Sequence, residues 1–259
     1  MANLDNQPAR YGATATGALG AIDEGLRAHM LRVYNYMAIG LVLTGLAAFG
    51  TYSLAVTSDP AAAVAQLPGG ILLTSFGATL YGTWLMWVLI LAPLALVFFL
   101  SYRISKMSVG AAQITFWAYA ALLGVSLSSI FLVYTMASIT QVFFITAATF
   151  GAMSLWGYTT RRDLTAMGSF LMMGVFGLVI AMLVNLFLQS PAIGWAISVV
   201  GVIAFTGLTA YDTQKIKEMY TVNDDGTMAG RKAIMGALAL YLDFVNLFLF
   251  LLRIMGSRR

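Results

Sequence analysis

Charge is scarce in this chain: Asp, Glu, Lys and Arg together make up 9% of its 259 residues. A soluble domain carries about 25% charged residues. Apolar and aromatic types supply 60% of the sequence, and the mean hydropathy is +0.86. Water cannot solvate such a composition in one or two ordinary domains. The composition therefore excludes a soluble enzyme, a disordered protein and a nucleic-acid-binding domain.

Cysteine is absent and histidine occurs once, as His29. These counts exclude disulfides, thiolate metal sites and a metal site built from several histidines. A retinal protein needs a lysine in its last span, but no lysine follows Lys232. A rhomboid-type protease needs an intramembrane histidine, a zinc protease needs His-Glu-x-x-His, and a nucleotide site needs a glycine loop, and the sequence provides none of them. We therefore expect no resident cofactor.

Long apolar runs are abundant. Crossing about 30 Å of hydrocarbon takes roughly 20 helical residues, and seven segments come close to or exceed that length. No apolar core suited to a cleavable signal peptide precedes them, so we expect a retained, polar and flexible N-terminus over residues 1–24. Residues 25–259 are predicted to form an all-α, seven-helix integral membrane domain. The predicted spans are Val33–Leu54, Thr83–Ser101, Val109–Val133, Gln141–Tyr158, Met167–Leu188, Ile193–Tyr211 and Ala233–Leu252.

The connections differ in composition and charge. The long first one, Ala55–Gly82, contains Pro60, Pro68 and two adjacent glycines, and is predicted to be extended or partly helical. Of the 14 Lys and Arg residues, eleven fall before the first span or in every second connection, and the alternate connections contain none. Cytoplasmic loops carry the Lys and Arg excess, so this pattern predicts a cytoplasmic N-terminus.

The last span departs from this pattern. A full crossing, which we favour, would place Arg253, Arg258 and Arg259 on the side that otherwise lacks cations. If the segment instead turns back, it is re-entrant and the three arginines lie on the cytoplasmic side.

Two of the ten acidic residues lie within or at the end of a span: Asp212 closes the sixth, and Asp243 lies in the middle of the seventh. A carboxylate at a helix centre costs about 2.5–3.5 kcal/mol even on the more lenient insertion scale. At 1.5 Å per residue, the two lie about 14 and 18 Å from the shared turn. Adjacent antiparallel helices would bring them to one level, where they would share a proton and titrate as a pair.

A packing role is the alternative for these two residues. Each Asp could simply hydrogen bond a nearby Tyr211, Thr209, Tyr241 or Asn246. Asn246 shares a face with Asp243 at i+3. Arg103, at the cytoplasmic end of the second span, is the nearest plausible countercharge, although a terminal arginine can also be a snorkelling anchor.

One enzyme class survives these exclusions. Intramembrane aspartyl proteases carry Tyr-Asp in one span and Gly-x-Gly-Asp in the next. Tyr211-Asp212 imitates the first motif, but Leu240-Tyr241-Leu242 precedes Asp243 and does not match the second. We keep proteolysis as a remote alternative and expect a non-enzyme.

Three strings resemble the bacterial branch of the Bax inhibitor (transmembrane BAX inhibitor motif) family over about residues 25–256. They are Leu31-Arg32-Val33-Tyr34, Tyr211-Asp212-Thr213-Gln214-Lys215-Ile216 and Ala239-Leu240-Tyr241-Leu242-Asp243-Phe244-Val245-Asn246-Leu247-Phe248. The resemblance implies a bundle in the bacterial inner (plasma) membrane, with the last helix central among the other six. It also implies a pH-sensitive calcium leak gated by aspartates at positions 212 and 243, with Arg103 as latch.

The leading hypothesis is therefore a passive calcium leak, with Asp212 and Asp243 as proton-sensitive gate and cation ligands. Tyr211, Tyr241 and Asn246 are secondary site candidates. The second hypothesis is a regulator that binds another membrane protein, and the resemblance points to a membrane-bound ATP-dependent protease as that partner.

Overall fold

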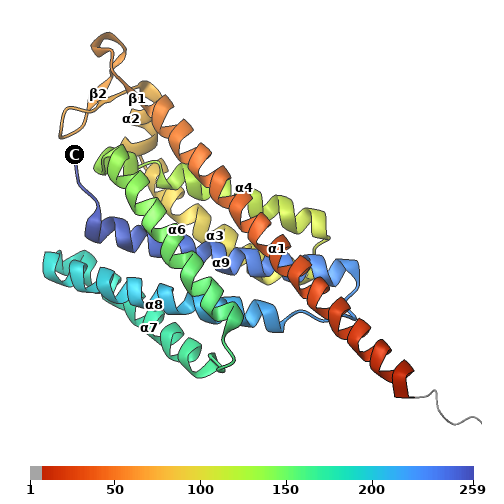
Figure 1. The fold of residues 1–259 in the computed structure, drawn as a ribbon. Coiled ribbons are helices and arrows are strands. Elements are labelled where there is room, and N and C mark those ends of the chain that lie inside the picture. Colours follow the sequence, from red (N-terminus) through yellow and green to blue (C-terminus); the bar gives the residue numbers. More distant parts are fainter. Residues whose placement is uncertain (1–7) are drawn as a thin grey trace, which may run out of the picture.

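The computed structural model describes residues 8–259, with side chains from residue 24 onward apart from Ser105. Within this part of the chain, seven helical segments are long and apolar enough to cross a membrane, which confirms the predicted number of spans (Figure 1). They are formed by α1 (Pro8–Ala55), α3 (Leu85–Arg103), α4 (Val109–Leu127) with the short α5 (Ile130–Val133), α6 (Met136–Thr159), α7 (Thr165–Leu188), α8 (Pro191–Glu218) and α9 (Gly226–Met255).

The N-terminal segment is not separated from the first span by a break in helix. Helix α1 runs from Pro8 to Ala55, so the expected boundary between residues 24 and 25 falls inside it. Residues 1–7, the first part of the segment expected to be flexible, lie outside the described residues.

Polar residues in the short connections begin several of the helices. The side chains of Ser108, Thr135, Ser190 and Asp225 accept hydrogen bonds from first-turn amides of α4, α6, α8 and α9. Each cap satisfies an amide that has no partner within its own helix. The caps thereby define where four of the long helices start.

The connection after α1 is more structured than the sequence predicts. Its short strands β1 (Val56–Thr57), β2 (Ala65–Gln66) and β3 (Leu72–Leu73) form an antiparallel sheet in the order β1-β3-β2. A 3-10 turn, η1 (Pro60–Ala62), and the helix α2 (Ser75–Gly82) complete it. Gly69 and Gly70 both have positive φ angles, which makes the tight turn before β3 possible.

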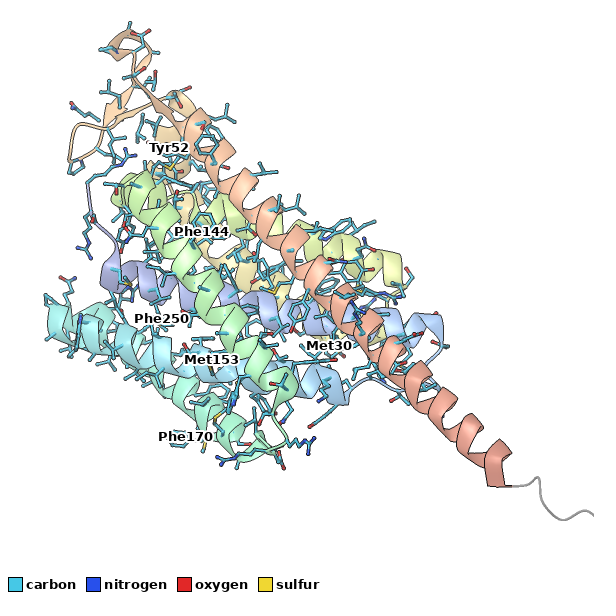
Figure 2. All side chains as sticks on the ribbon, viewed as in Figure 1. Met30, Tyr52, Phe144, Met153, Phe170 and Phe250 are labelled. Atoms are coloured by element: carbon cyan, nitrogen blue, oxygen red, sulfur yellow. The ribbon has the colours of Figure 1, made fainter. Side chains whose placement is uncertain are left out.

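Helix α9 is the most buried of the seven. In its apolar membrane-spanning stretch 72% of the residues are buried, whereas the value is at most 39% in any other span. It packs chiefly on α1, α4, α6 and α8, whereas α3 and α7 pack chiefly on α4 and α8. A last helix surrounded by all six others therefore stays a prediction. On the outside of the bundle, Phe144 and Phe170 are 66% and 69% exposed and suit a lipid environment (Figure 2).

The two ends of α9 lie at opposite ends of the bundle. Beyond its last turn, the amide of Thr135 donates to the Ser257 carbonyl at 3.1 Å, and the Arg259 amide donates to the Val133 carbonyl at 3.0 Å. The chain thus finishes beside the connection between α5 and α6 and close to the small sheet (Figure 1). This position agrees with a last helix that crosses fully.

Candidate functional site

Helices α8 and α9 form the most extensive helix pair in the structure. Glycines allow the close approach: a Cβ on Gly236 of α9 would lie 3.1 Å from Ile216, and a Cβ on Gly201 of α8 would lie 2.7 Å from the ring of Phe250. Phe250 also stacks on Phe205, with ring centroids 5.8 Å apart. We call this close contact between α8 and α9 the α8–α9 seam. It determines which side chains of the two helices face each other.

The seam brings Asp212 of α8 and Asp243 of α9 together, with their carboxyl groups within hydrogen-bonding reach. Asp243 is 4% exposed, and its Oδ2 atom has no hydrogen-bond partner among the described residues. Asp212 is partly buried, and the positively charged Lys215 ammonium one turn away attracts its carboxylate electrostatically. Asp243 therefore has the other carboxyl group as its main polar neighbour.

A line of hydroxyl groups runs to the residue next to Asp212. Tyr34 of α1 bonds the Ser154 hydroxyl of α6 at 2.6 Å, and Ser154 bonds Thr213 of α8 at 2.9 Å. Thr213 in turn donates to the Thr209 carbonyl at 2.7 Å. Sequence reasoning did not single out Ser154 or Thr213 as site residues, because a lone hydroxyl in a span most often bonds its own helix.

The two tyrosines expected near the aspartates point elsewhere. The Tyr211 ring packs on Gly168 of α7, where a Cβ would come too close to it. The Tyr241 hydroxyl bonds Thr44 of α1 at 2.6 Å, and its ring makes edge contacts with Phe116 and Tyr119 of α4. The structure thus uses both tyrosines to hold helices together.

Among the described residues, the side chains of Asn246 and Arg103 also make no hydrogen bond with the pair. The Asn246 amide donates to the Leu242 carbonyl of its own helix at 2.8 Å. Arg103 is exposed at the end of α3, and the structure records no hydrogen bond or ion pair of its side chain with a described residue. The expected latch contact between Arg103 and the aspartates is not formed in this structure.

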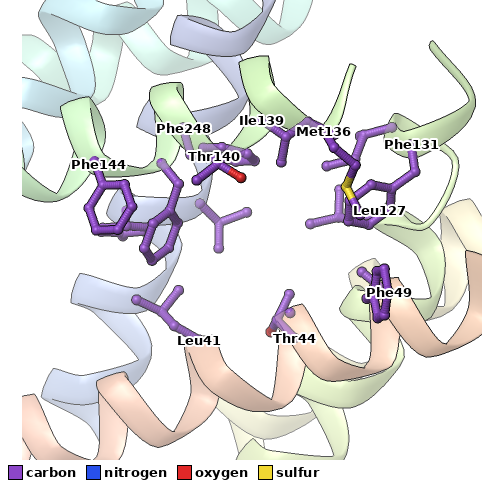
Figure 3. A pocket seen from close by; sticks show the side chains of 16 residues that line it. Leu41, Thr44, Phe49, Leu127, Phe131, Met136, Ile139, Thr140, Phe144 and Phe248 are labelled. Carbon is purple, nitrogen blue, oxygen red and sulfur yellow. The ribbon is translucent and has the colours of Figure 1, made fainter. Parts of the chain in front are cut away.

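An apolar cavity of about 410 Å³ lies between α1, α5, α6 and α9. Its wall on α9 begins directly after Asp243, at Phe244, and continues toward the C-terminal end of that helix. Figure 3 shows Leu41 and Phe49 of α1 facing Phe144, Ile139 and Met136 of α6 across it. Two threonine hydroxyls, Thr44 and Thr140, are the main polar groups on its walls.

The described residues contain no cluster of three or more His, Asp or Glu side chains suited to a metal. Calcium takes six to eight oxygen ligands, and the pair offers two carboxyl groups. A calcium ion at this point would therefore need carbonyl and water oxygens as well, which suits an ion in transit better than one held permanently.

The chain is similar to known proteins over almost its whole length. The family model described as inhibitor of apoptosis-promoting Bax1 matches residues 26–259. An uncharacterized protein of Rickettsia prowazekii is 46% identical over 246 residues, which cover 95% of this chain and 96% of that protein. The inner membrane protein YbhL of Escherichia coli K12 is 48% identical over 237 residues, which cover 91% and 94%.

Proposed function

Because this chain belongs to the Bax inhibitor family, we propose that it is a pH-sensitive calcium leak in the bacterial inner membrane, with its N-terminus in the cytoplasm. Asp212 and Asp243 would act as its gate and as transient cation ligands. The observation that carries the proposal is the contact between these two carboxyl groups inside the bundle, with one Asp243 oxygen buried and unpartnered.

The pair supports a response to protons. Two carboxyl groups in contact away from water cannot both be ionised cheaply, so one proton between them stabilises the contact. Raising the pH removes that proton, and the two negative charges then repel each other or attract a cation. The charged group that interacts electrostatically with Asp212, apart from Asp243, is Lys215 on the same helix.

The surroundings support a gate that is shut in this arrangement. Beyond Asp243, the inward side chains of α9 are buried and apolar, including Leu247, Phe248 and Leu251. Closely packed apolar side chains block ions because water does not wet the space between them. Separation of the α8–α9 seam, rather than side-chain rotation alone, would be needed to let a hydrated ion pass.

The test is calcium flux into liposomes that contain the purified protein, measured across a range of pH. The parent is expected to conduct in a pH-dependent way. The double variant Asp212→Asn/Asp243→Asn is expected to lose that dependence, because the asparagine amide still forms hydrogen bonds but does not ionise.

Asp163→Asn is the matched control for charge. Asp163 is exposed between α6 and α7, and hydrogen bonds from Thr165 lower the pKa of its carboxyl group. It therefore stays ionised throughout the assay, and its loss should leave the pH profile as in the parent. An unchanged profile in the double variant would rule out the aspartate gate.

A protein without flux would instead favour the second hypothesis, a regulator of another membrane protein. In that case a partner, such as a membrane-bound protease, should copurify equally well with the parent and with the double aspartate variant. The same protein preparation therefore separates the two functions.

A further inference from the structure

A second cavity, of about 610 Å³, lies at the end of the bundle where α9 terminates. The turn from α7 to α8 and the last residues of the chain form its walls. We call it the C-terminal cavity. Its polar lining consists of Asn185, Gln189, Ser190, Arg253 and Arg258, and the other lining residues are apolar, glycine or proline.

Among the side chains that the structure describes, the cations of this cavity have no anionic partner. Arg253 and Arg258 are exposed, and within residues 24–259 the one ion pair found joins Lys232 to Asp224. The connections at this end of the bundle contain a single acidic residue, Asp59, whose carboxylate accepts a hydrogen bond from the Ala61 amide.

Arg259, the third cation at this end, is engaged differently. Its guanidinium lies 5.8 Å from the centre of the Tyr52 ring and donates to the Tyr52 hydroxyl at 3.2 Å. Two of the three cations that break the charge pattern of the loops thus line one cavity, while the third packs on α1.

The turn from α7 to α8, which forms another part of the lining, is also suited to a negative charge. Helix α8 begins there at Pro191, and the positive end of a helix dipole favours anions. The side-chain Oδ1 of Asn185 accepts a hydrogen bond from the Ser190 amide at 3.0 Å, which holds the turn in place. Gln189, with φ of 49°, adds an amide side chain to the same wall.

The rim of the C-terminal cavity is apolar and faces outward. Leu186 and Trp195 line the cavity and are 67% and 62% exposed, and the neighbouring Phe187 is 85% exposed. Tryptophan at the end of a span is typical of the depth of lipid headgroups. A ligand here would meet hydrocarbon on one side and two guanidinium groups on the other.

We propose that the C-terminal cavity binds the phosphate of an anionic phospholipid headgroup, with Arg253 and Arg258 as its two cationic contacts. Guanidinium groups bind phosphate oxygens through paired, charge-assisted hydrogen bonds. The apolar rim accounts for an acyl chain, which a free phosphate ion lacks.

The test is titration of the purified protein in detergent with phosphatidylglycerol, followed by native mass spectrometry, with phosphatidylcholine as the reference lipid. The double variant Arg253→Gln/Arg258→Gln should bind phosphatidylglycerol roughly tenfold more weakly than the parent. Arg259→Gln removes a cation from the same end of the bundle without touching the cavity, so it should bind as the parent does.

Loss of phosphatidylglycerol confined to the double variant would support the assignment. Equal affinity in all three proteins, or an equal loss in Arg259→Gln, would overturn it. A separate titration with inorganic phosphate tests the source of the anion. If inorganic phosphate displaces phosphatidylglycerol at similar concentrations, the cavity recognises a free anion and the lipid assignment is wrong.

Discussion

Tyr241 and Asp243 stand two positions apart on α9, and the helix directs their side chains to different neighbours. Tyr241 is fully buried and bonds Thr44 of α1, whose own hydroxyl lies 2.9 Å from the Ala120 carbonyl of α4. Asp243 meets Asp212 of α8 instead. Two nearby polar residues of one helix therefore have separate roles, Tyr241 in helix packing and Asp243 at the candidate gate.

Replacing Tyr241 with Phe tests this separation. The variant leaves the ring contacts in place but removes one buried hydrogen bond, so it should lower the free energy of unfolding by about 1 kcal/mol. Thermal unfolding in detergent measures the loss, and the pH profile of calcium flux should not change. Tyr211→Phe should be nearly neutral, because the Tyr211 hydroxyl makes no hydrogen bond with any residue whose side chain the structure describes. A shifted flux profile in Tyr241→Phe would assign this tyrosine to the gate.

At the scale of helices, glycines determine how closely neighbours approach. A Cβ on Gly157 of α6 would lie 2.2 Å from the backbone carbonyl of Ala210 on α8, and one on Gly124 of α4 would lie 2.4 Å from that of Thr44. Gly151, also on α6, has open space around it. Glycines that look alike in the sequence thus differ in their importance for helix packing, because only some of them face the backbone of another helix.

Gly157→Ala and Gly151→Ala form a matched pair on one helix. Alanine at 157 must push α6 away from α8, which should destabilise the protein by about 1–3 kcal/mol. Alanine at 151 meets no neighbour and should be neutral or stabilising by up to about 1 kcal/mol, because alanine favours the helix more than glycine does. Thermal unfolding in detergent compares the melting temperatures of the two variants. Equal melting temperatures would mean that α6 and α8 are not in close contact.

At the scale of the molecule, the bundle has two chemically distinct ends. Eleven Lys and Arg residues lie in the N-terminal part of α1 or at and between the facing ends of α3 and α4, α6 and α7, and α8 and α9. The other end contains the small sheet and the finish of the chain. The two proposed sites are distributed along this axis, with the aspartate pair inside the bundle and the C-terminal cavity at the end poor in loop cations.

Cysteine labelling tests this axis cleanly, because the chain has no cysteine of its own. The exposed positions Asp59, Asp163 and Ser257 can each be changed to Cys in a separate variant. A membrane-impermeant reagent applied to intact cells should label Asp59→Cys and Ser257→Cys but leave Asp163→Cys unlabelled. Labelling of Asp163→Cys alone would reverse the orientation, and separation of Ser257→Cys from Asp59→Cys would mean that α9 does not cross fully.

The sequence by itself determined the class of the protein, the number of spans and the positions of the two aspartates. Apolar runs and isolated charges are visible in the local sequence, and a charged side chain is unfavourable in the hydrocarbon core of the membrane at any position along the chain. Only the tertiary structure decided that Tyr211 and Tyr241 face away from Asp212 and Asp243, and that Arg103 stays apart. Those outcomes depend on the rotation of each helix about its axis, which is determined by the fit of glycines and rings between neighbours and not by spacing along one helix.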